Sequence, residues 1–128
     1  MASLGRHILA EFGGCDAARL ADLSIVEGSM LDAARISGAT IVTHSFHHFA
    51  GQDGGQGVSG AVIIAESHLA IHTWPEHQFA ALDFFTCGQG VDVRKALDHL
   101  KEAFQAKSEE LLELERGPLR IGTVVVRN

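Results

Sequence analysis

Three short apolar runs between residues 58 and 85 constrain the fold of this chain more than any other feature. Val58 to Ala65 is almost continuously apolar, Leu69 to Trp74 alternates, and Phe79 to Phe85 is a third apolar run. Such runs are typical of strands, and the links between them are short. The sequence therefore predicts neighbouring strands of an antiparallel sheet.

Helices and further strands are predicted on both sides of these runs. Ser24, with Glu27 three residues later, forms a capping-box pattern at the start of a helix that Gly38 would end. Asp92 can cap a second helix with an apolar face, and Asp16 to Leu23 is a short helix candidate. Additional strands are predicted at His7–Phe12, Ala39–Phe46 and Ile121–Val126. This mixture predicts an α+β fold: a two-layer sandwich, with an antiparallel β-sheet and helices packed on one face.

Composition excludes several classes of protein. The 128 residues fit a single domain, 1–128, and the net charge of −6 argues against a nucleic-acid surface. No apolar stretch approaches the roughly 18 residues of a membrane span, and no secretory signal is visible. Two cysteines, Cys15 and Cys87, do not make a disulfide framework. We expect a cytoplasmic protein with reduced thiols, no nucleic-acid partner and no membrane partner.

The string from Glu66 to Glu76, E-S-H-L-A-I-H-T-W-P-E, carries the chemistry. A serine hydroxyl can attack the carbonyl before it, and the resulting ester can be lost by β-elimination, which leaves a pyruvoyl group and ammonia. Such a cut needs a base, and His68 and His72 are candidates. On a plain strand Ser67 and His72 would face opposite sides. We therefore predict a turn or bulge near Ser67 and His68.

The segment Gly57 to Gly88, which contains this string and Phe85-Thr86-Cys87-Gly88, closely resembles the prokaryotic S-adenosylmethionine decarboxylase proenzymes. Ser3-Leu4-Gly5-Arg6-His7, Ser37 to Thr43 and Phe46 to Phe49 are also similar to that family, so the resemblance runs from about Ser3 to Phe104. It implies a two-layer sandwich that pairs into a homodimer. It also implies self-cleavage between Glu66 and Ser67, giving a β chain of residues 1–66 and an α chain of residues 67–128 that stay associated.

The resemblance also implies roles for single residues. Ser67 becomes the pyruvoyl cofactor, which forms a Schiff base with the amine of S-adenosylmethionine and accepts the electrons left by loss of CO2. His72 is the proton acceptor in processing and Ser59 assists, while Cys87 is the proton donor in decarboxylation. Phe49 stacks on adenine, from the same protomer or across the dimer, and Glu76 holds the ribose hydroxyls. The product is the aminopropyl donor for spermidine synthesis, and we expect no putrescine activator.

Plainer interpretations stay open. Cys87 and Phe49 can simply pack, Glu76 can be a solvated charge, and Trp74 is expected to pack rather than bind. The histidine clusters allow a metal-binding module, although convergent ligands are few, and we predict no metal site. The same chemistry could serve arginine or ornithine, or the chain could be an uncleaved, non-catalytic partner subunit. The loop Gly51 to Gly57 is longer and richer in glycine than expected for the family.

Overall fold

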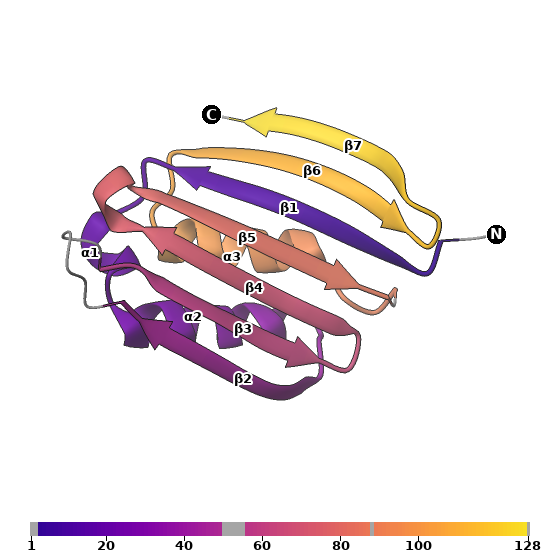
Figure 1. Ribbon diagram of the computed structural model, residues 1–128, viewed down its shortest axis with the longest axis horizontal. Coiled ribbons are helices and arrows are strands. Elements are labelled where there is room, and N and C mark those ends of the chain that lie inside the picture. Colours follow the sequence, from indigo (N-terminus) through magenta and orange to yellow (C-terminus); the bar gives the residue numbers. More distant parts are fainter. Residues whose placement is uncertain (1–2, 50–55, 88, 128) are drawn as a thin grey trace.

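The computed structural model describes residues 3–49, 56–87 and 89–127, and these form one antiparallel sheet of seven strands in the order β2-β3-β4-β5-β1-β6-β7 (Figure 1). Residues 51–55 of the glycine-rich loop Gly51 to Gly57 lie outside the described residues. The strands are β1 (Gly5–Gly13), β2 (Ile41–His48), β3 (Val58–Ile64), β4 (Ser67–Trp74), β5 (Phe79–Thr86), β6 (Ser108–Arg116) and β7 (Arg120–Arg127).

The helices α2 (Leu23–Ile36) and α3 (Val93–Ala103) lie on the same face of this sheet (Figure 1). The short helix α1 (Ala17–Leu20) precedes α2, and a 3-10 turn, η1 (Pro75–His77), joins β4 to β5. The predicted α+β fold, with an antiparallel sheet and helices on one face, is therefore confirmed. No helix among the described residues is long and apolar enough to cross a membrane.

Local caps explain most helix boundaries. Asp92 caps α3 as predicted, because its side chain accepts a hydrogen bond from the Lys95 amide. The capping box at Ser24 was a wrong prediction: Asp22 is the N-cap of α2 and accepts from the Ile25 amide, so the helix starts two residues earlier than predicted. Gly38 follows the end of α2 with φ of +89°, a conformation that glycine adopts without strain.

The core lies between the helices and one face of the sheet. Along β5 the residues Ala80, Leu82, Phe84 and Thr86 are buried, and the residues between them are only partly buried. This alternation means that every second side chain of the central strands points away from the helices. On β4 those side chains include His68 and His72. No described element covers this second face, which we call the open face.

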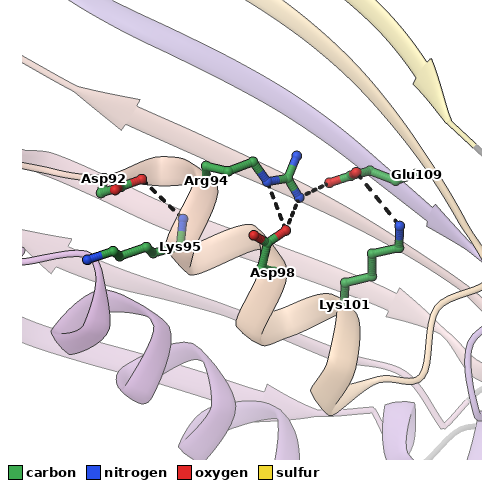
Figure 2. Close-up of polar contacts among 6 residues, drawn as sticks. All are labelled: Asp92, Arg94, Lys95, Asp98, Lys101 and Glu109. Carbon is green, nitrogen blue, oxygen red and sulfur yellow. Dashed lines mark hydrogen bonds and ion pairs between the residues drawn. The ribbon is translucent and has the colours of Figure 1, made fainter.

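Strand β6 was missed by the sequence analysis because its sequence, S-E-E-L-L-E-L-E-R, is dominated by charge. It pairs with β1 along its whole length. One of its glutamates, Glu109, is only 1% exposed. Its Oε1 forms an ion pair with the Arg94 guanidinium of α3 at 2.6 Å (Figure 2). Lys101 lies 4.0 Å from the same carboxylate, and Arg94 also bonds Asp98. The carboxylate therefore ties α3 to β6.

Replacement of Arg94 by leucine should cost about 2 kcal/mol of unfolding free energy, because it strips a buried carboxylate of its close cation. The double variant Arg94→Leu/Glu109→Leu should lose less than the single variant, since no buried charge then remains. Urea unfolding of both variants measures the difference. A double variant that is less stable than Arg94→Leu would show that Glu109 without Arg94 is still favourably held, for example by Lys101, and that the orphaned charge costs little.

Candidate active site

The peptide bond between Glu66 and Ser67 lies at the tight turn that joins β3 to β4. Residues 65 and 66 form the turn, and Ser67 is the first residue of β4, paired with Ile64 and Thr86. Ser67 has φ of 139°, which residues other than glycine rarely adopt. Such backbone strain persists only where the surroundings impose it, and it is common at reactive sites.

Three hydrogen bonds hold Glu66 in this turn. The Ala65 amide donates to the Thr40 carbonyl at 2.8 Å, and the Thr40 amide donates to Oε1 of Glu66 at 3.0 Å. The backbone hydrogen bond from Thr40 is the main reason that the pKa of the Glu66 carboxyl lies below its usual value. The third bond runs from the Cys87 amide to the Glu66 carbonyl oxygen, at 2.8 Å.

This third bond matters chemically because the Glu66 carbonyl is the group that a nucleophilic Ser67 would attack. A backbone N–H on that oxygen stabilises the negative charge that develops during attack. Cys87 follows the last residue of β5 and is exposed. The structure therefore brings Glu66, Ser67 and Cys87 together where β4 begins and β5 ends, and we call this place the Ser67 corner.

His72 and Ser59 lie elsewhere on the sheet, near the other end of β4. They face each other across β3 and β4, and Ser59 Oγ lies 2.6 Å from His72 Nδ1. His72 comes five positions after Ser67, a distance of about 16 Å along an extended strand. The predicted bulge is absent, because β4 keeps its register with β3 and β5 over this stretch. Only the unusual φ of Ser67 marks the predicted place, and the two residues do not meet within one chain.

The predicted substrate residues gather at the His72 end. Phe49 follows β2, is 50% exposed, and contacts the His47 ring edge-to-face with centroids 4.5 Å apart. His47 is paired with Ser59 in the sheet register. Glu76 lies in η1 and is exposed. Trp74 is 40% exposed, and its ring lies 5.6 Å from the Phe79 ring, centroid to centroid.

A cluster of rings beside the Ser67 corner contains His68, a candidate base from the sequence, together with Phe85 and His7, to which the sequence assigned no role. His68, Phe85 and His7 sit side by side on β4, β5 and β1, with centroids 5.8 Å apart for His68–Phe85 and 5.5 Å for His7–Phe85. The Arg116 guanidinium lies 4.7 Å from the Phe85 ring centroid. Strand alternation would have placed His7 on this face, but only the pairing of β1 with β5 shows its neighbours.

The His7 imidazole is an incompletely satisfied group. Its Nε2 is buried without a hydrogen-bond partner among the described residues, and Asp83 Oδ1 is 3.9 Å away. Burial lowers the pKa of His7, the negative charge of Asp83 opposes this, and Arg116 and His68 lower it further. His7 therefore favours its neutral form more strongly than a free histidine does.

Stability should consequently depend on pH through His7. The unfolded chain binds the proton with a pKa near 6.5 and the folded protein binds it more weakly, so stability is lost as pH falls through 6.5 toward the lowered pKa. His7→Phe keeps a ring against Phe85 and should flatten this acid loss. Urea midpoints between about pH 7.5 and 5.5 test it.

The matched control is His77→Phe, at an exposed position, which should keep the pH dependence of the wild type. Parallel curves for wild type and His7→Phe would contradict the assignment.

Metal ligation finds no support in the described part of the chain, which contains no group of three or more His, Cys, Asp or Glu side chains able to hold an ion. His44, which forms one histidine cluster with His47 and His48 in the sequence, lies 3.3 Å from Glu27 of α2. His68 and His72 share the open face, but they are separated along β4 and have different neighbours.

Comparison with known proteins was made with both sequence and structure. The family model described as S-adenosylmethionine decarboxylase matches residues 6–117. The chain is 54% identical over 117 residues to the S-adenosylmethionine decarboxylase proenzyme of Thermotoga maritima, covering 91% of this chain and 87% of that protein. It is 53% identical to the proenzyme of the same name from Acidithiobacillus ferrooxidans, over 91% of this chain and 85% of that protein. The crystal structure of the adenosylmethionine decarboxylase from Aquifex aeolicus superposes with a TM-score of 0.82 at 29% identity, covering 96% and 98% of the two chains.

Proposed function

Because this chain belongs to the S-adenosylmethionine decarboxylase family, we propose that it cleaves itself between Glu66 and Ser67 and then decarboxylates S-adenosylmethionine. The products of the cut are a β chain of residues 1–66 and an α chain of residues 67–128 that begins with a pyruvoyl group. The observation that carries this proposal is the hydrogen bond from the Cys87 amide to the Glu66 carbonyl, beside a strained Ser67.

The residues at this corner suit both reactions. In the cut, the Cys87 N–H stabilises charge on the Glu66 oxygen while the Thr40 contacts keep the peptide from moving away. The pyruvoyl group supplies an electron sink for the electrons left when CO2 departs. Cys87 then returns a proton to the substrate, since it is exposed and directly follows Thr86, the ladder partner of the residue that becomes the cofactor. We propose the cytoplasm as the site of action, where thiols remain reduced.

The separation of His72 from Ser67 supports a homodimer. A single chain leaves the Ser59–His72 pair about 16 Å along β4 from the serine that it is proposed to serve. A second copy related by a two-fold axis can place its own pair at this serine, and the symmetry then completes both sites at once. The open face carries the Ser59–His72 pair and the rings of His68 and Phe85 beside Ser67, and no described element covers it, so we propose that the two sheets meet there.

In this arrangement each site is shared between subunits. Phe49 and Glu76 lie at the same end as His72, so the partner subunit would supply the adenine-stacking ring and the ribose carboxylate together with the processing pair. The substrate would therefore lie between the two open faces. Its sulfonium would gain from nearby aromatic rings by about 0.5–2 kcal/mol.

Denaturing mass spectrometry of the purified protein should show two fragments, residues 1–66 and 67–128, and the second should gain mass with phenylhydrazine, which reacts with the pyruvoyl ketone. Ser67→Ala should remain one chain of 13.7 kDa and have no activity, because it lacks the attacking hydroxyl. Ser45→Ala, at an exposed serine of β2, is the control and should be processed normally.

A wild-type chain that stays intact after long incubation would contradict the proposal and favour the non-catalytic subunit. Cleavage with CO2 release from labelled arginine or ornithine, but not from S-adenosylmethionine, would place the enzyme with the other pyruvoyl decarboxylases.

A shared site also predicts complementation between two inactive variants. His72→Ala and Ser67→Ala should each stay uncleaved when made alone. When they are refolded together, mixed dimers pair an intact Ser67 with the intact His72 of the other subunit. The His72→Ala chain should then be cleaved, to roughly half at equal amounts if subunits mix at random. An isotope label on one variant identifies the cleaved chain by mass.

Cleavage of His72→Ala alone at the wild-type rate would show that another base serves Ser67. No cleavage in verified mixed dimers would show that the pair does not act across the interface.

A further inference from the structure

We propose that the α-carboxylate created on Glu66 by self-cleavage is itself a positioning group, which holds the Cys87 amide and keeps the Cys87 thiol protonated for its role as the acid. This inference rests on the self-cleavage and on the role of Cys87 proposed above. Cleavage would then create two functional groups: the pyruvoyl group, and a fixed negative charge next to the proton donor.

The charge follows from the balance of the reaction. Attack of Ser67 Oγ on the Glu66 carbonyl carbon forms an ester C–O bond and breaks the C–N bond to residue 67. A base then removes the Ser67 Cα proton, and the Cβ–Oγ bond breaks with its electron pair moving to Oγ. The oxygen leaves with Glu66, whose former peptide carbonyl becomes a free carboxylate. A neutral group has been replaced by an anion at the same carbon atom.

The position of this anion is set before the cut. The Glu66 carbonyl oxygen lies 2.8 Å from the Cys87 nitrogen, and Sγ is only three covalent bonds from that nitrogen. Two contacts do not involve the scissile bond: the Ala65 amide on the Thr40 carbonyl, and the Thr40 amide on Oε1 of Glu66. These contacts tether residue 66 to the start of β2. The new chain end therefore stays at Cys87 after the link to Ser67 is lost.

A carboxylate in this place opposes a second negative charge on Sγ, because like charges at short range disfavour ionisation. An N–H···O⁻ hydrogen bond is also stronger than one to a neutral carbonyl, so the contact tightens when the peptide becomes a carboxylate. Cys87 is exposed, and water reduces the effect, so we expect about a tenfold lower thiolate fraction at a given pH. The charged and titratable groups on the elements around this corner include Glu66 and His68 beside it, Asp83 on β5, Arg6 and His7 on β1, Glu115 and Arg116 on β6, and Asp92 at the start of α3.

A partially processed sample of the wild-type protein allows Cys87 to be compared in cleaved and uncleaved chains. Both the intact chain and the 67–128 fragment carry Cys87, and denaturing mass spectrometry separates them after timed reaction with iodoacetamide, which attacks the thiolate. Between about pH 7 and 9, Cys87 in the fragment should react about tenfold more slowly than Cys87 in the intact chain. The two rates should converge at higher pH, where both thiols are ionised, which removes any difference in access. Cys15, in the other fragment, is an internal control because burial raises the pKa of its thiol to about 11.

Three variants sharpen the test. Ser67→Ala supplies an uncleaved protein if the wild type is fully processed, and its Cys87 should react as in the intact wild-type chain. Glu66→Gln keeps an oxygen acceptor for the Thr40 amide and should preserve the slow reaction after cleavage. Glu66→Ala removes that tether, so its cleaved form should lose part of the difference. The alkaline limb of its kcat should also move to lower pH.

Equal pH dependence of Cys87 alkylation in cleaved and uncleaved chains would overturn the inference, as would faster reaction in the fragment. Failure of the proposed function looks different, since no 67–128 fragment or no CO2 release would then be seen. A cleaved, active enzyme with unchanged Cys87 reactivity would remove only the role assigned to the new carboxylate.

Discussion

The hydrogen-bonded position of β4 between β3 and β5 is the constraint on which the rest of the structure depends. It fixes Ser67 at the start of a central strand, directly after the tight turn at residues 65 and 66, with hydrogen-bonded strands on both sides. The same pairing carries the end of β5 to this turn, so that the Cys87 amide meets the Glu66 carbonyl. A cut at this bond leaves β3 and β4 paired along their lengths, so the two fragments have reason to stay together.

Much of the fold could be predicted because the central strands are apolar. The runs around Val58–Ile64 and Phe79–Thr86 are buried against the helices, and burial imposes the alternation that the sequence shows. Strand β6 could not be predicted in the same way. Two of its glutamates form ion pairs with neighbouring elements: Glu109 with Arg94 of α3, and Glu113 with Arg6 of β1. Charge pairing across elements is set by tertiary position, which no local pattern reveals.

The candidate site likewise contains residues that a local motif identifies and residues that only strand pairing brings together. The proximity of Glu66 and Ser67 is covalent, and their motif could be recognised directly. Cys87 reaches them through the pairing of β4 with β5. That these strands are neighbours was predicted, but the register that brings Cys87 to the turn is not specified by sequence spacing. The bulge predicted between Ser67 and His72 assumed that both must meet within one chain. The structure contradicts this assumption, because β4 pairs regularly with β3 and contains no bulge. The only backbone irregularity at the predicted place is the unusual φ of Ser67.

The distance between Ser67 and the Ser59–His72 pair bears on when the chain can cut itself. A strained peptide with an N–H on its carbonyl is prepared for attack, yet elimination also needs a base for the Cα proton. If the partner subunit supplies that base, a folded monomer holds the strained bond without breaking it. Cleavage would then follow pairing, and the cofactor would appear only in a protein whose substrate site is already enclosed between two open faces. The regular register of β4 keeps His72 away from Ser67 of the same chain. Self-cleavage would therefore depend on dimer formation.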